Sequence, residues 1–307
     1  MELPRRERTC GAILHSGRSG PVTWVPLAIV TAIGFASAGS YSKALSKRAH
    51  VYVVTWALLA LSAPWTALAL MRSGMPPIGD EFLRAALISV AVNMVGTTIH
   101  VKALSLSPLS LTMPFLAFTP LFMLVPSWIV LGETPGAFGL LGIVLIVGGG
   151  YAMHLDKIRG GFLAPLKAIA REKGSLLTLL VAAIWSISAV YDKVATVNSS
   201  PAYYTTFFSL AFALVYAPFL VLGLRKRPPD LATWPRLALL GLFTAIMILS
   251  QFAALEMTVA SYVIAIKRAG MILSVVFGYF FFKEKHLRAR LTGAMLMMAG
   301  VVVLSVQ

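Results

Sequence analysis

The sequence is poor in charge, in acidic residues and in cysteine. Charged residues occupy 12% of the 307 positions, whereas soluble globular chains carry about 25%. Hydrophobic residues occupy 58%, and the mean hydropathy is +0.84. So few charges cannot cover a water-facing surface, which predicts an all-α polytopic membrane protein. The single cysteine, Cys10, excludes an intramolecular disulfide and a cysteine-based metal site.

Acidic residues number 11 against 26 basic ones, and the net charge is +15. The cations fall in short runs between apolar stretches, as at 157–159 and 225–227. Such runs suit anionic lipid headgroups, so we expect the bilayer and no nucleic acid as a partner. The sequence contains no HExxH, phosphate-binding loop, nucleophile elbow or paired aspartate motif. These absences predict no enzyme, no cofactor, no metal and no ATP-driven step.

Apolar runs separated by turn or charge signals predict ten spanning helices, since a span needs about 20 apolar residues. The predicted ranges are 24–43, 52–71, 84–104, 109–131, 137–154, 175–196, 202–223, 235–257, 260–282 and 289–306. The first range also resembles a signal peptide ending at Ala36-Ser37-Ala38, but cleavage there would remove a member of the repeat described next.

The two halves of the chain repeat. Residues 35–43 read FASAGSYSK and 185–193 read WSISAVYDK, an offset of 150, and 131–150 match 282–301 at an offset of 151. Five helices per copy is an odd number, so the second copy enters the membrane inverted, as in many secondary transporters. We expect a polar tail (1–23), two five-helix repeats (24–154 and 175–307) and a connection (155–174) that is either an amphipathic surface helix or a solvated loop.

Two signatures carry a family resemblance. A glutamate followed by a glycine-containing helix occurs twice, at Glu133 and Glu284. Repeated prolines precede the first of them, at Pro108, Pro114, Pro120 and Pro126. The chain resembles the drug/metabolite transporter superfamily in its ten-helix form with two EamA-type repeats. The resemblance implies two inverted five-helix bundles around a central cavity, lined mainly by the first, third, fourth, sixth, eighth and ninth helices. Because the superfamily is broad, it names no substrate.

Lys267 and Arg268 lie inside the ninth predicted span, where each charge costs about 2.5–3.5 kcal/mol on insertion scales. Such residues usually face a bundle interior and bind ligand, and adjacent positions diverge by about 100°, so one can face the cavity and the other a neighbouring helix. The alternative is a structural ion pair, for example with Glu256. The pair is similar to the Lys-Arg pair of plastid-type sugar-phosphate exchangers, and only these two positions match.

Other polar residues complete the predicted site. Lys43 and Lys193 occupy equivalent positions near helix ends and either bind ligand or reach toward the headgroups. Further candidates for ligand binding, for which packing is the alternative, are Tyr41, Tyr191, Asn93, His100, Gln251, Tyr262 and Trp185. The residues expected to form ion pairs or carry a coupling proton are Glu256, Asp192 and Lys102. Glu133 and Glu284 are expected to cap helices, and the four prolines to kink one.

Because an arginine fork and a lysine suit an anionic group, the sequence predicts a secondary transporter that moves a small organic anion, or a zwitterion, by alternating access. One alternative is an exporter of amino acids or drugs with Lys267 and Arg268 structural, and another is a lipid-phosphate translocator. The expected location is the bacterial inner (plasma) membrane, and monomer or homodimer stays open. Lys and Arg concentrate in loops after odd-numbered spans, which favours outside termini, whereas the resemblance favours inside termini.

Overall fold

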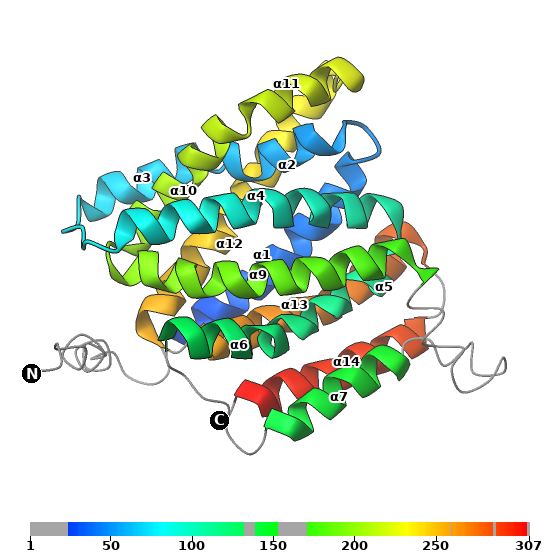
Figure 1. The fold of residues 1–307 in the computed structure, drawn as a ribbon. Coiled ribbons are helices and arrows are strands. Elements are labelled where there is room, and N and C mark those ends of the chain that lie inside the picture. The colour runs from blue at the N-terminus through cyan, green and yellow to red at the C-terminus, as the bar shows by residue number, and fades with distance from the viewer. Residues whose placement is uncertain (1–23, 132–138, 153–170, 259, 285–286, 306–307) are drawn as a thin grey trace, which may run out of the picture.

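The computed structural model describes residues 24–131, 139–152, 171–258, 260–284 and 287–305. Within these ranges the chain is helical and contains no β-strand (Figure 1). The first half contains α1 (Trp24–Leu45), α2 (Val51–Ala60), α3 (Ala63–Ser73), α4 (Phe82–Leu106), α5 (Leu109–Thr112), the 3-10 helix η1 (Met113–Phe118), α6 (Thr119–Leu131) and α7 (Gly139–Ala152). The second contains α9 (Lys173–Val197), α10 (Pro201–Val215), α11 (Ala217–Lys226), η3 (Leu231–Thr233), α12 (Trp234–Met257), α13 (Ala260–Phe282) and α14 (Leu287–Ser305).

Each predicted span falls on one helix or on consecutive helices. By length and composition, five described segments can cross a membrane, and a sixth can if α10 and α11, bent by 53°, count as one. The expected all-helical membrane fold is therefore confirmed. That ten helices span, with the repeats inverted, stays a prediction. The predicted connection and the cap Glu133 lie outside the described residues.

Local sequence explains where several helices begin and break. Ser200 caps α10 by accepting from the Tyr203 amide at 3.2 Å, with Pro201 in the first turn. Pro108 immediately precedes α5, and Pro114 lies in the 3-10 segment. Proline lacks the amide hydrogen that a continuous helix needs, so the predicted span 109–131 is divided into α5, η1 and α6. Of the other two prolines, Pro120 is the second residue of α6 and Pro126 lies inside that helix without ending it.

The helix contacts follow the sequence repeat. α4 packs along α9, and α1 packs along α12, which are the equivalent pairs of the two halves. α1 also packs on α13 as α9 packs on α6. α7 and α14 pair with each other at one edge of the bundle in Figure 1, and α3 pairs with α10 on the opposite side. This exchange of partners is what two equivalent halves related by an approximate two-fold axis would give, and it surrounds the centre with α1, α4, α9, α12 and α13.

Candidate functional site

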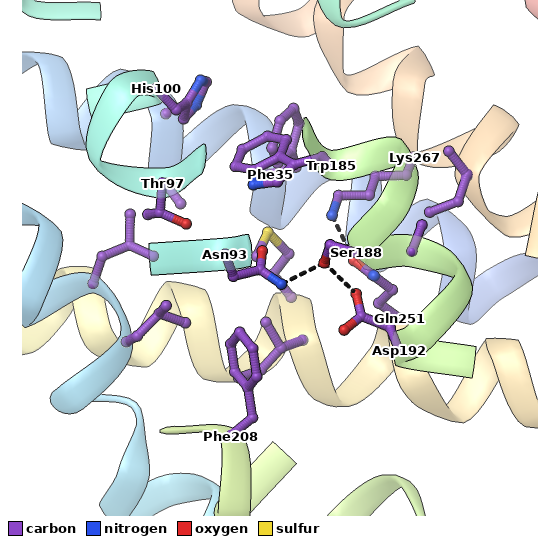
Figure 2. Close-up of a pocket in the computed structure, with 18 of the residues that line it drawn as sticks. Phe35, Asn93, Thr97, His100, Trp185, Ser188, Asp192, Phe208, Gln251 and Lys267 are labelled. Atoms are coloured by element: carbon purple, nitrogen blue, oxygen red, sulfur yellow. Dashed lines mark hydrogen bonds between the residues drawn. The ribbon is translucent and has the colours of Figure 1, made fainter. Parts of the chain in front are cut away.

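A cavity of about 100 Å³ lies between the two halves (Figure 2). Helices α1, α2, α4, α9, α10, α12 and α13 contribute to its wall. Ligand pockets for drug-sized molecules measure about 300–1,000 Å³. The cavity is smaller than these, so in this conformation it suits a molecule smaller than a typical drug. Most of the wall is apolar, and a few charged and amide groups converge on it from different helices.

The cationic wall comes from α13. Lys267 Nζ lies 5.0 Å from the centre of the Phe35 ring and Arg268 Cζ lies 5.6 Å from it, so both cations contact the same aromatic ring. Lys267 donates to Gln251 Oε1 at 2.5 Å, and Arg268 donates to Thr119 Oγ1 at 2.9 Å. Both side chains line the cavity, although adjacent positions on a helix diverge by about 100°. Arg268 thus both lines the cavity and contacts the neighbouring helix α6 through Thr119.

Arg268 retains unused donors. Its residue is 2% exposed, and neither Nε nor Nη1 has a hydrogen-bond partner among the described residues. Leaving a buried polar group unpaired costs about 1–3 kcal/mol, and more when the group is charged. The backbones of α13 and α1 pack closely here, because a β-carbon at Gly270 would overlap the carbonyl oxygen of Ala32 on α1. The guanidinium thus presents two nitrogens without partners in a wall that already contains Lys267.

An aromatic wall adjoins the cations. His100 and Trp185 rings lie 4.9 Å apart, and the Phe35 ring is 6.1 Å from His100 and 6.3 Å from Trp185. A β-carbon at Gly96 would lie 2.7 Å from Trp185 Nε1, so only glycine lets the indole pack against α4. Trp185 Nε1 and His100 Nδ1 are buried without hydrogen-bond partners in the described part of the chain. They add two further polar groups able to meet a ligand.

Asp192 lies on the same cavity wall and is 7% exposed. Its Oδ1 accepts hydrogen bonds from Ser89 Oγ and, at 2.5 Å, from Tyr204 Oη. Its Oδ2 accepts from Ser188 Oγ at 3.2 Å. Asn93 links the two serines: it donates to Ser188 Oγ, as Figure 2 shows, and to Ser89 Oγ at 3.1 Å. A carboxylate and two cations therefore share one enclosed space.

Several residues predicted for the site lie elsewhere. The predicted residues that line the cavity are Lys267, Arg268, Asn93, His100, Gln251, Trp185 and Asp192. Those outside its lining are Lys43, Lys193, Tyr41, Tyr191, Lys102 and Glu256. Tyr41 packs edge-on against Phe243 with 6.0 Å between ring centres, and Tyr191 packs against the main core. The side chain of Tyr262 lies outside the described set.

The alternative pairing of the buried cations with Glu256 is not observed. Glu256 is exposed on α12 and forms no described ion pair with Lys267 or Arg268. Lys102 is likewise exposed on α4. Their charges face away from the centre because neighbouring positions on each helix face it instead.

Glu284 joins the two halves at one end of the bundle. Its carboxylate accepts from the amides of Leu109 and Ser110 at 2.6 and 2.9 Å, and from the Ser110 hydroxyl. It also pairs with Lys43 at 3.5 Å and Arg290 at 3.3 Å. Burial would raise the pKa of Glu284, but the bonds from Ser110 and Leu109 and the nearby Lys43 hold it below its ordinary value. Lys43 thus serves this cluster and not the cavity.

The repeat could have identified lining residues that were not singled out from the sequence. At the offset of 150, the cavity-lining pairs are Phe35 with Trp185, Ala38 with Ser188, Gly39 with Ala189 and Ser42 with Asp192. Equivalent positions of α1 and α9 therefore face the same space. Thr97 and Phe208 also line it and carried no sequence signal.

Helices long and apolar enough to cross a bilayer, arranged around a small cavity whose mostly apolar wall carries a few charged groups, define a membrane protein with a central cavity. The model of the EamA-like transporter family matches residues 22–154 and 172–306, so the chain belongs to this family. A crystal structure of a protein with 18% sequence identity is similar with a TM-score of 0.63, over 90% of this chain and 97% of that one. At this identity the likeness shows the fold alone. No match was found among curated proteins.

Proposed function

We propose that the protein is a secondary transporter that moves a small anion-bearing molecule, with Arg268 and Lys267 as the anion site. Membership of the EamA-like family makes it a membrane transporter of small molecules. The observation that carries the substrate class is Arg268, whose Nε and Nη1 are buried beside the cavity without partners. A guanidinium is a planar donor that fits carboxylate or phosphate, and an anion would satisfy the two nitrogens.

Alternating access is proposed on the position of this site. The cavity lies where the two repeats meet, and equivalent helices of both halves line it. A site between inverted repeats is reached from either side when one half rocks against the other. The proposal includes ten spans with the second repeat inverted, and the plasma membrane of a bacterium as the location. The small cavity favours a soluble metabolite over a lipid phosphate.

The test is thermal stabilisation of the purified full chain by a panel of phosphate esters, phosphonates, carboxylates, amino acids and cationic drugs. A ligand that binds the native state raises its melting temperature by mass action. Lys267→Gln and Arg268→Gln are compared with Lys102→Gln and Arg84→Gln, which remove exposed cations. Anions should stabilise wild type and both controls, and the two cavity variants should lose at least tenfold in affinity while remaining folded.

The opposite result would favour the exporter alternative. If the cavity variants respond to every anion as wild type does, Lys267 and Arg268 are structural. Stabilisation of wild type by cationic drugs alone would replace the anion as substrate class. Transport is then measured in proteoliposomes with the ligand that binds most tightly, and counterflow without ATP would establish the secondary mechanism.

A further inference from the structure

An anion site does not account for the carboxyl group of Asp192, which would repel an anionic ligand. It lies on α9, lines the cavity and is 7% exposed. None of the ion pairs in the described part of the chain includes it. Lys267 acts on Asp192 electrostatically without forming an ion pair, so the buried acid lacks a directly bound cation, which a cationic ligand group would supply. Two cations and one acid thus line the same space, and the contacts of the cations are with Gln251, Thr119 and the Phe35 ring, not with the acid.

The hydrogen bonds around Asp192 have a defined direction. The amide nitrogen of Asn93 can only donate, and it donates to the hydroxyl oxygens of Ser89 and Ser188. Each hydroxyl therefore turns its single hydrogen to the aspartate, Ser89 to Oδ1 and Ser188 to Oδ2. Tyr204 Oη lies 2.5 Å from Oδ1 and 2.9 Å from Ser89 Oγ, and has one hydrogen to donate between them. Two serine hydroxyls and the tyrosine hydroxyl thus surround the carboxyl group as potential donors.

The carboxylate also has room for one more donor. A carboxylate oxygen accepts about two hydrogen bonds, and Oδ2 accepts one from the described residues. Lys267 does not fill this place, since no hydrogen bond or ion pair joins its amine to Asp192; the amine donates to Gln251 at 2.5 Å and lies over the ring of Phe35. In Figure 2, Lys267 and Asp192 extend from different helices toward the same space. A ligand between them would meet a cation on one side and an acid on the other.

We propose that Asp192 is a specificity-determining residue that binds a protonated amine, so that the ligand is a small zwitterion with its anionic group on Arg268. The inference rests on the proposed function, since it assigns the second charged group of the same site. Asn93 is a positioning residue, which directs both serine hydroxyls toward the acid. A cavity of about 100 Å³ limits the separation of the two charges to that of a small metabolite.

The first experiment needs no variant. Binding to the full chain in detergent is measured by calorimetry for matched triads, each comprising an amino acid, its des-amino acid and its decarboxylated amine. The triads are built on alanine, leucine and phenylalanine. In at least one triad the zwitterion should bind tenfold or more tightly than both analogues, because each analogue leaves one charged side of the cavity uncompensated.

The variants separate the two proposals. Asp192→Asn should abolish the preference for the amino acid over its des-amino analogue, whereas Asp80→Asn, an exposed control, should keep it. If the amino acid and its des-amino analogue bind equally well to wild type and to Asp192→Asn, the amine site is overturned and the anion site is retained. A decarboxylated amine that binds as tightly as the amino acid overturns both the zwitterion proposal and the anion site. Both are also overturned if no member of the triads and no anion of the panel binds. Ser188→Ala, which removes the bond to Oδ2, should reduce the same preference severalfold if Asp192→Asn fails to fold.

Discussion

Replacing Glu284 by glutamine should destabilise the protein more than any single loss of a surface charge. The carboxylate is 8% exposed and forms ion pairs with Lys43 and Arg290, whose side chains are each 12% exposed. It also accepts the first amides of α5, from Leu109 and Ser110. Glutamine keeps the shape of the side chain but removes the charge and turns an NH₂ group toward these donors. Two buried cations then lose their counter-ion.

The magnitude follows from burial. Removing one member of a buried ion pair costs about 3–5 kcal/mol, because the remaining charge stays buried without compensation. At roughly 2–4 °C per kcal/mol for a chain of this order of size, the melting temperature should fall by about 6–20 °C. The matched control is Glu81→Gln, whose partner Arg84 lies 3.7 Å away with side-chain exposures of 60% and 73%. That exposed pair should contribute about 0–1 kcal/mol.

The pH dependence gives the prediction a second readout. The folded protein holds the pKa of Glu284 below its ordinary value, so the carboxylate stabilises fully above the unfolded pKa of about 4.3 and stops doing so as pH falls through the folded value. The difference between wild type and Glu284→Gln should therefore be constant from about pH 6 to 8 and shrink below about pH 4. Differential scanning fluorimetry across this range measures it. Equal melting temperatures of Glu284→Gln and the Glu81→Gln control would show that the buried ion pairs contribute no more than the exposed one.

Three further predictions follow from single contacts. Glu172→Ala removes the cap of α9, which accepts from Ser175 at 2.5 Å, and should cost about 0.5–2 kcal/mol in thermal unfolding. Burial alone would raise the pKa of Glu172, but hydrogen bonds from Ser107 and Ser175 outweigh it and hold the pKa below its ordinary value. The loss of stability in Glu172→Ala should therefore also vanish at acid pH. Gly96→Val should displace the Trp185 indole, measured as a shift in tryptophan emission with a tenfold or greater loss of ligand affinity, and unchanged emission would contradict the contact. Lys102→Gln should leave stability within about 0.5 kcal/mol and ligand binding unchanged, since that lysine is exposed.

The helices were readable from the sequence because apolar runs of membrane length are interrupted by proline, glycine and charge. The breaks within spans were harder to read. α2 ends at Ala60 and α3 begins at Ala63, and α10 and α11 meet at a 53° bend beside Tyr216. A bilayer tolerates such breaks when neighbouring helices satisfy the freed backbone groups, which is a property of the packing and leaves little trace in composition.

Which side chains face the cavity depended on helix rotation, and single positions decided it. Tyr41 and Lys43 were expected in the site, but Ser42 between them lines it. In the second half, Asp192 lines it while its neighbours Tyr191 and Lys193 do not. Consecutive residues point about 100° apart, so a polar stretch on an α-helix offers one position in three or four to a given face. Composition identified the stretches, and only packing fixed the rotation.

The repeat places the cavity, and divergence between its copies supplies the chemistry. Ser42 and Asp192 hold equivalent positions on α1 and α9, so a neutral hydroxyl in one half corresponds to a carboxylate in the other. At the offset of 151, Lys267 and Arg268 correspond to Leu116 and Ala117, which are buried in the core. Among the described lining residues, the two cations and the acid thus all belong to the second repeat. A scaffold with two similar halves presents a polarised wall to its ligand, which can orient a molecule with unlike ends as a symmetric wall cannot.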